Sequence, residues 1–168
     1  QIAHRLVLEV NNKLVAVDAT MGNGHDTLFL ATHFDQVHAF DVQPLAWERT
    51  KEKVAHCPHV CLYLTSHRNI IKHVTSPIDV ILFNLGYLPG SDKMITTNIH
   101  DVILAITEAH SHLSKQGRII LVVYTKHNNN YDFPILESFL LTNHLSYQVL
   151  KPKGTEIVIC IEASKAIS

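Results

Sequence analysis

The sequence has no excess of either charge. Its 168 residues hold 14 lysines and arginines against 15 aspartates and glutamates, a formal net charge of -1. A basic excess over the whole chain, the electrostatic footprint of many nucleic-acid-binding proteins, is therefore missing. Hydrophobic residues make up 46% and charged residues 17%, which predicts a folded globular protein and excludes a disordered one. The length suits one domain, residues 1–168, with one core.

Long apolar runs are missing as well. No stretch approaches the roughly 20 apolar residues that a membrane-spanning helix needs. The chain also does not open on a basic segment followed by an apolar signal core. We therefore expect no membrane association and a cytoplasmic location.

Cysteine is scarce, and its spacing is uninformative. Cys57, Cys61 and Cys160 form no C-x-x-C pair and no zinc-ligand spacing, so we expect ordinary buried thiols in a reducing compartment. Histidine is frequent, with 13 residues, yet no H-E-x-x-H or similar spacing appears. We predict surface and core histidines and no metal site.

The chain has only six glycines, and two of them fall in one short stretch. The apolar run 15–18 ends in Asp18, Gly22 and Gly24 follow, and a helix is predicted after them. This is the pattern of a nucleotide-type cofactor site at the first strand-to-helix crossover of a doubly wound α/β sheet. Glycines let the backbone approach a ligand closely, and a helix N-terminus offers free N–H groups and a positive dipole end.

Apolar runs and turn residues divide the rest of the chain into elements. We predict strands over 15–18, 37–41, 60–64, 78–84, 118–124, 146–150 and 156–162. We predict helices over 1–14, after Gly24, over 44–56, after His67, over 97–113 and over 132–143. The turn Pro152-Lys153-Gly154 is too short for a crossover helix, so the last two strands must be antiparallel neighbours.

This order predicts an α/β, Rossmann-like fold with helices on both faces of the sheet. Seven mostly parallel strands that close with an antiparallel hairpin are the arrangement of class I S-adenosylmethionine-dependent methyltransferases. Dinucleotide-binding domains end differently, and their fingerprint needs a small residue where this chain has Thr27. The alternative is that Gly22-Asn23-Gly24 is merely a tight turn.

In a methyltransferase, this loop would supply most of the cofactor ligands. In the methyltransferase pattern, Thr20 holds the place of the first of three glycines. Asp18 can hold the ammonium of the cofactor's amino-acid tail through a backbone or water relay. The candidate cofactor-binding residues of the loop are Asp18, Thr20, Gly22, Asn23, Gly24, His25, Asp26 and Thr27.

Polar residues also follow the second and third strands. Asp41 ends the second strand about twenty residues after the first acid, the separation at which a carboxylate accepts hydrogen bonds from a ribose diol. Gln43 lies beside it and is a further candidate for cofactor binding. Ser66 and His67 follow the third strand, where the adenine ring usually lies in this fold. The alternatives are an exposed strand-end acid for Asp41 and a helix cap for Ser66.

Asn84 ends the fourth strand, and Tyr87 follows three residues later. Amino-methylating enzymes often carry Asn or Asp and then Pro-Pro-Tyr at this place, and here Leu85-Gly86 replaces the two prolines. The Asn oxygen and a backbone carbonyl accept from the N–H groups of the acceptor and aim its lone pair at the methyl group. The aromatic ring stacks on the acceptor or the sulfonium. Asn84 and Tyr87 are the predicted catalytic residues, and Asn84 is also a candidate for cofactor binding, although Asn and Gly are also common in loops.

The runs 18–27 and 84–93, with Thr96-Thr97, resemble a family of small bacterial class I methyltransferases known as putative rRNA methylases. One branch of that family methylates the aminomethyl group of 5-aminomethyl-2-thiouridine at the tRNA wobble position. The resemblance covers about residues 1–125, and the third family motif survives only as Tyr124 and His127. It implies S-adenosylmethionine as cofactor and the anticodon stem-loop of tRNA as partner. A homodimer is the default expectation for oligomeric state.

Several alternatives stay open at this point. An rRNA methyltransferase, a small-molecule methyltransferase and a non-catalytic S-adenosylmethionine- or RNA-binding domain all fit the sequence. An alkylammonium acceptor must lose a proton before it can attack, and the candidates for its base are Asp26, His25 and His127.

Overall fold

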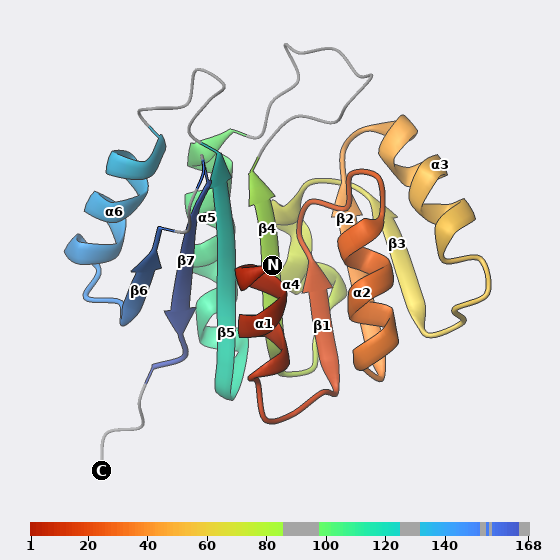
Figure 1. The fold of residues 1–168 in the computed structure, drawn as a ribbon, viewed down its shortest axis with the longest axis horizontal. Coiled ribbons are helices and arrows are strands. Elements are labelled where there is room, and N and C mark those ends of the chain that lie inside the picture. The colour runs from red at the N-terminus through yellow and green to blue at the C-terminus, as the bar shows by residue number, and fades with distance from the viewer. Residues whose placement is uncertain (86–97, 125–131, 152–153, 155, 165–168) are drawn as a thin grey trace.

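A seven-stranded sheet runs through the protein in the order β3-β2-β1-β4-β5-β7-β6 (Figure 1). The computed structural model describes residues 1–85, 98–124, 132–151, 154 and 156–164. The strands are β1 (Val15–Asp18), β2 (Gln36–Asp41), β3 (Val60–Leu64), β4 (Ile78–Leu85), β5 (Leu113–Tyr124), β6 (Tyr147–Leu150) and β7 (Glu156–Glu162). The helices are α1 (Ile2–Leu8), α2 (His25–His33), α3 (Pro44–Lys53), η1 (His67–Asn69), α4 (Ile70–His73), α5 (Ile99–Ala109), η2 (His110–His112) and α6 (Asp132–Thr142).

The predicted topology is confirmed. β1 to β5 pair in parallel, and β7 is antiparallel to both of its neighbours, β5 and β6. The register aligns the ends of the central strands, because Asp18 pairs with Ala39 of β2 and with Leu82 of β4. The residues that follow β1, β2 and β4 therefore meet at one edge, which we call the carboxyl edge of the sheet.

Both faces of the sheet are covered, so its central strands are apolar on both sides. The faces alternate along each strand: Ile81 and Phe83 of β4 pack with α4, α5 and α6, whereas Val80 and Leu82 pack with α1 and α2. α3 adds a smaller cluster on the second face, beside β2. Figure 1 shows α1 and α2 in front of the sheet, with α4 and α5 behind it. This double burial explains the near-continuous apolar runs of β4 and β5 in the sequence.

Several predicted boundaries shift, each for a local reason. α1 stops at Leu8 instead of residue 14, before the exposed pair Asn11-Asn12. α3 ends at Lys53 instead of residue 56, since Pro58 follows closely and disfavours helix before it. α5 begins at Ile99 because the Asn98 side chain caps it by accepting from the His100 N–H at 2.8 Å.

The fifth strand is longer than predicted, and the cysteines differ from one another. β5 begins at Leu113 instead of residue 118, and its pairing with β4 is irregular between Leu113 and Arg118. Cys160 is buried, but Cys57 is half-buried and Cys61 is exposed. The prediction of three buried thiols is therefore wrong for Cys61, because it lies on β3 at the margin of the sheet, where no further strand covers it.

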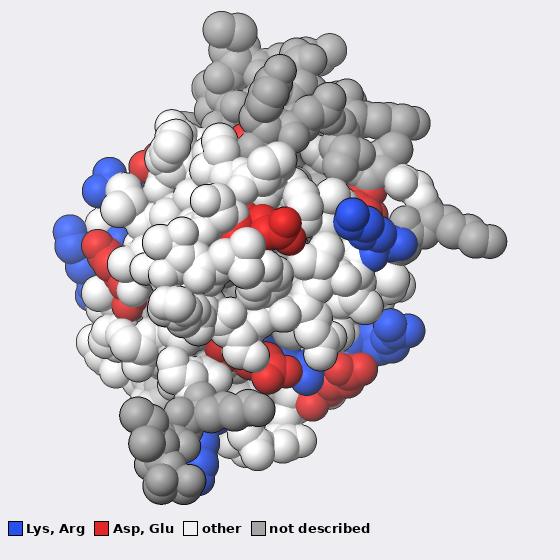
Figure 2. Space-filling view, turned by 90° about the vertical axis from the view of Figure 1, so that its left-hand side faces the viewer, with Lys and Arg blue, Asp and Glu red and all other residues white. Residues whose placement is uncertain are grey.

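Neither the described helices nor the face in Figure 2 indicates a membrane or a strongly charged partner. No helix in the described ranges is long and apolar enough to cross a membrane. On the face that Figure 2 presents, acidic and basic side chains are few and scattered, and neither sign gathers into a patch. That face therefore carries no electrostatic signature of a charged partner.

Candidate active site

The loop between β1 and α2 depends on its two glycines. Gly22 and Gly24 have φ of 51° and 84°, in the left-handed region that glycine tolerates best. A Cβ added to Gly24 would lie 2.9 Å from Thr50 Oγ1 and 3.0 Å from Thr50 Cα. The Gly24 N–H donates to the Met21 carbonyl at 2.8 Å, and Gly24 is the N-cap residue of α2. The loop thus packs closely on α3 and delivers the N-terminus of α2 to the carboxyl edge.

Asp18 lies beneath this loop and is fully buried. Its carboxylate accepts from the Thr27 hydroxyl at 2.6 Å and from the Thr20 N–H at 3.2 Å. Burial raises the pKa of Asp18 to about 7, and the neighbouring Asp26 carboxylate adds to the rise. Because no part of the Asp18 side chain reaches the surface, it acts on a ligand only through the loop that it shapes.

Thr20, which stands where a glycine was expected, ties the loop to β4. Its hydroxyl accepts a hydrogen bond from the Asn84 N–H at 2.7 Å. A glycine there would leave that N–H without this partner. Thr20 therefore fixes the end of β4, and with it the backbone of Asn84, against the loop.

The Asn84 side chain is held from two directions. Its Nδ2 donates to Asp26 Oδ2 at 3.2 Å, and the other Asp26 oxygen, Oδ1, lies 2.7 Å from His4 Nε2. On the β5 side, the Asn84 side chain forms a hydrogen bond with Tyr124. Burial and the Glu156 carboxylate raise the pKa of Tyr124, and this hydrogen bond lowers it. A chain of polar side chains thus runs from α1 to the end of β5. His4 was missed in the sequence, where no spacing links it to Asp26, 22 residues away.

Asp41 supports the same loop from β2. Its carboxylate accepts from the Gly22 N–H at 3.2 Å and from the Gln43 N–H at 3.0 Å. Asp41 stays partly exposed, and like Asp26 it contributes to the raised pKa of Asp18. Three carboxylates therefore converge at one edge, an electrostatic environment that suits a cationic ligand.

Near the end of β3 lie exposed apolar side chains and a histidine nitrogen that lacks a hydrogen-bond partner among the described residues. Ser66 Oγ accepts from the Arg68 N–H at 3.2 Å, so Ser66 forms the helix cap that was its alternative. His67 Nδ1 donates to the Ala19 carbonyl at 3.2 Å, and burial lowers the pKa of its ring. Among the described residues, its buried Nε2 has no hydrogen-bond partner. Nearby, Val42 and Leu64 are 57% and 50% exposed.

Two predicted loop residues face α3. Asn23 Oδ1 accepts from Arg49 Nη1 at 2.8 Å, and Lys53 Nζ lies 3.0 Å from His25 Nδ1. Both contacts are at the rim of the loop, away from Asn84. Tyr87 and His127, together with 86–97 and 125–131 as a whole, lie outside the described residues. The described ranges contain no group of three or more metal-binding side chains.

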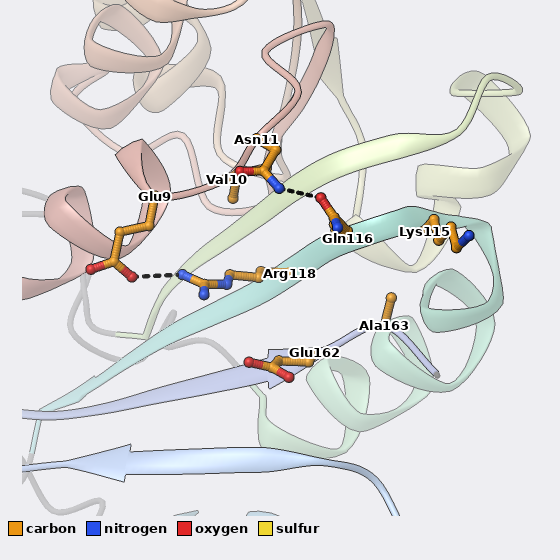
Figure 3. A pocket seen from close by; sticks show the side chains of 9 residues that line it. Glu9, Val10, Asn11, Lys115, Gln116, Arg118, Glu162 and Ala163 are labelled. Carbon is orange, nitrogen blue, oxygen red and sulfur yellow. Dashed lines mark hydrogen bonds and ion pairs between the residues drawn. The ribbon is translucent and has the colours of Figure 1, made fainter. Parts of the chain in front are cut away.

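The opposite edge of the sheet has a groove of a different character (Figure 3). It lies between the end of α1 and the start of β5, and its charged groups include both signs. Arg118 is already engaged there, by the Leu6 carbonyl at 3.1 Å and by Glu9 at 3.0 Å. The lining residues are Glu9, Val10, Asn11, Lys115, Gln116, Gly117, Arg118, Glu162 and Ala163. This groove contains none of the predicted site residues.

Comparison with known proteins gives consistent matches. The family described as "Putative rRNA methylase" matches residues 37–160. The chain is 30% identical over 157 residues to the chloroplastic tRNA (mnm(5)s(2)U34)-methyltransferase of Arabidopsis thaliana, covering 83% of this chain but 57% of that longer relative.

Solved structures match over nearly the whole chain. A putative methyltransferase from Streptococcus mutans in complex with SAH is 33% identical, with a TM-score of 0.84, and the match covers 96% of this chain and 95% of that one. A putative rRNA-methylase from Clostridium thermocellum is 29% identical, with the same TM-score and the same coverage of both chains.

Proposed function

The chain belongs to the rRNA methylase family, and from that premise we propose that it transfers a methyl group from S-adenosylmethionine to tRNA. The acceptor that we propose is the aminomethyl group of 5-aminomethyl-2-thiouridine at the wobble position. The observation that supports this most directly is the position of Asn84. It lies at the end of β4, tied to the glycine loop through Thr20 and to the Asp26 carboxylate. An amide held beside a cofactor loop is suited to orient an amine.

The residues at the carboxyl edge fit S-adenosylmethionine. Asp41 suits the ribose diol, and the exposed side chains of Val42 and Leu64 suit the flat adenine ring. His67 Nε2, which has no hydrogen-bond partner among the described residues, is an acceptor for the adenine amino group. The loop backbone that Asp18 shapes would hold the amino-acid tail. When bound, the cofactor supplies a methyl group on a cationic sulfonium, a charge that the three carboxylates favour.

The acceptor amine needs an orienting group and a base. The NH2 group of Asn84 faces Asp26, so its carbonyl oxygen is left for an N–H of the acceptor. Among the base candidates, Asp26 is the best placed, because its carboxylate contacts Asn84 directly and is 17% exposed. His25 faces Lys53 at the rim. We assign the proton acceptor to Asp26.

The RNA substrate is proposed by analogy with the relatives. The Arabidopsis protein has a tRNA wobble uridine in its name, and this chain spans 57% of its length. A second candidate is a methyltransferase for a small-molecule amine, which the net charge of -1 favours. Binding to RNA phosphates weakens steeply with salt, whereas binding to a small amine has no such polyelectrolyte term.

An in vitro transfer assay tests the proposal. The purified chain is incubated with radiolabelled S-adenosylmethionine and bulk tRNA, from a strain that lacks the gene and from its parent. We expect label in tRNA from the deletion strain, little in parental tRNA, and strong inhibition by added salt. Absence of label from both tRNA pools, or equal labelling of both, would contradict the proposed substrate.

A further inference from the structure

Asn84 is oriented by its neighbours, and the first of these is Asp26. A side-chain amide has a donating NH2 on one side and an accepting oxygen on the other. A carboxylate only accepts, so the contact of 3.2 Å with Asp26 Oδ2 fixes the NH2 toward Asp26. The Asn84 oxygen must then point away from Asp26. Together with the Tyr124 contact on the β5 side, whatever holds Asp26 in place therefore helps to decide which way the acceptor-facing oxygen points.

The second neighbour is His4, on a different helix. His4 Nε2 lies 2.7 Å from Asp26 Oδ1, and since the carboxylate accepts, Nε2 carries the proton. The imidazole in turn stacks on Phe29 of α2, with ring centroids 3.8 Å apart and planes 4° from parallel. The ring is therefore fixed in position and angle. Phe29, His4, Asp26 and Asn84 form a continuous series of contacts.

Docking of α1 does not need this hydrogen bond. Ala3, Leu6 and Val7 of α1 are buried in the core, at 7%, 6% and 0% exposure. Arg118 adds a hydrogen bond to the Leu6 carbonyl. These contacts hold α1 independently of the His4–Asp26 pair, whose side chains are 24% and 17% exposed. The directional role of His4, through Asp26, is thus separable from the structural role of α1.

We propose that His4 is a positioning residue for methyl transfer: through Asp26, it holds the Asn84 oxygen toward the acceptor amine. This inference rests on the proposed function for its substrate. It makes α1 part of the acceptor site although α1 carries none of the predicted site residues. Its main effect is on the rate of transfer, because a change at His4 leaves the Asp26 carboxylate in place for the cofactor and alters the direction of the Asn84 amide.

Three variants separate the hydrogen bond from the ring. His4→Phe keeps a flat ring on Phe29 but removes the donor, and His4→Gln restores a donating NH2. The matched control is His33→Phe, because His33 is exposed and also contacts the Phe29 ring, with ring centroids 4.9 Å apart, but lies in the last turn of α2, whereas Asp26 lies in the first. Each variant is assayed for kcat and KM with the tRNA substrate, for S-adenosylmethionine affinity by calorimetry, and for melting temperature.

We expect His4→Phe to lower kcat by about 10- to 100-fold, the cost of misplacing a reacting group. Cofactor affinity and melting temperature should stay at wild-type values, His4→Gln should recover most of the rate, and His33→Phe should behave as wild type. Wild-type kcat in His4→Phe would overturn the proposal. So would a loss of kcat that is matched by losses of cofactor affinity and thermal stability, because that pattern marks a purely structural residue.

A measurement without substrate separates this inference from the proposed function. In ¹⁵N-labelled protein, the side-chain NH2 resonances of Asn84, assigned with Asn84→Asp, report its contact with Asp26. They should shift in His4→Phe and stay in place in His33→Phe. If the wild-type chain methylates no tRNA yet these shifts occur, the substrate proposal fails and the positioning role stands. If the resonances do not move in His4→Phe, the positioning role fails.

Discussion

Two buried aspartates lie at opposite edges of the sheet, and their surroundings differ. One is at the carboxyl edge, and the other is at the edge where the parallel strands begin, which we call the amino edge. Asp79, at the amino edge, accepts from the Leu14 and Val15 N–H groups at 3.1 and 2.9 Å and from the Ser114 hydroxyl at 2.7 Å. Asp18, at the carboxyl edge, has two donors and lies close to the carboxylates of Asp26 and Asp41. One aspartate is surrounded by donors, and the other lies among like charges.

The contrast distinguishes an edge that stabilises the fold from an edge whose charges suit a ligand. Three donors compensate a buried carboxylate and join β1, β4 and β5. Accumulated negative charge is unfavourable in the empty site, and a cation relieves it. At the amino edge, Arg118 is bound by the Leu6 carbonyl and by Glu9. At the carboxyl edge, His67 Nε2 is buried without a partner among the described residues. Ligand chemistry is therefore expected at the carboxyl edge.

The largest expected effect is on activity at the carboxyl edge. Asn84→Ala removes the amide that orients the acceptor and should lower kcat by at least about 100-fold, with cofactor affinity close to that of wild type. Gln116→Ala, which removes an exposed amide from the groove at the amino edge, is the matched control and should retain full kcat. Steady-state kinetics and calorimetry measure both. Loss of cofactor binding in Asn84→Ala would refute the positioning role of Asn84.

The second expected effect is on stability at the amino edge. Asp79→Ala leaves two backbone N–H groups and a hydroxyl without this acceptor, the Val15 N–H in a buried position, and should lower the free energy of unfolding by about 3 kcal/mol. The exposed Asp35 provides the control Asp35→Ala, which should change it little. Urea denaturation gives both values. Folded Asp79→Ala should keep its cofactor affinity, and a selective loss of that affinity would break the distinction between the edges.

Asp18 should make stability depend on pH. Its pKa is raised from 3.8 to about 7 in the folded protein, so the folded state binds more protons than the unfolded state between these values. The free energy of unfolding contributed by Asp18 therefore falls as pH rises from about 4 to 7, by an amount on the order of 1 to 3 kcal/mol.

Asp18→Asn isolates this contribution, because it replaces the titrating group by an amide of the same shape. We expect wild type and variant to differ in the slope of unfolding free energy against pH across that window, with the variant gaining relative stability toward pH 7. Chemical denaturation across the pH range measures the slopes. If the unfolding free energies of wild type and variant changed in parallel with pH, the pKa of Asp18 would be the same in the folded and unfolded states.

The smallest expected effect concerns His67. If Nε2 accepts from the adenine amino group, His67→Phe should weaken S-adenosylmethionine binding by about 0.5 to 1.5 kcal/mol. Its neighbour gives a control in the opposite sense, because Ser66→Ala removes a helix cap and should lower stability by about 1 kcal/mol without weakening cofactor binding. Titration calorimetry and thermal melts distinguish the two. Equal cofactor affinity in wild type and His67→Phe would remove His67 from the cofactor site.

The sequence predicts those parts of the site that the topology dictates. Asp18, Asp41 and Asn84 each end an apolar run, and the carboxyl ends of parallel strands meet at one edge. The turn between the last two runs dictates the hairpin in the same way. Glycines at 22 and 24 mark backbone that other residues strain to adopt. The predicted placements agree with the structure because each depends on a short stretch and on a general rule of sheet geometry.

Contacts between distant segments cannot be predicted from such rules. His4 meets Asp26 only because α1 packs across the sheet beside α2, and a scattered histidine carries no mark of that contact. The Thr20 hydroxyl gains its role from the Asn84 N–H, which lies 64 residues away. Asp18 and Asp79 look alike in the sequence, since Asp18 ends one apolar run and Asp79 interrupts another. Only their donors and neighbouring charges tell them apart.

Nucleoside mass spectrometry tests our proposal that the carboxyl edge supports methylation of a wobble aminomethyl group. Wobble nucleosides of bulk tRNA are compared between a strain that has the gene and one that lacks it, with Asn84→Ala and wild-type complementation. We predict that 5-aminomethyl-2-thiouridine accumulates without the gene and with Asn84→Ala, and that the wild-type gene restores the methylaminomethyl form. Unchanged wobble nucleosides in the deletion strain would contradict the proposal.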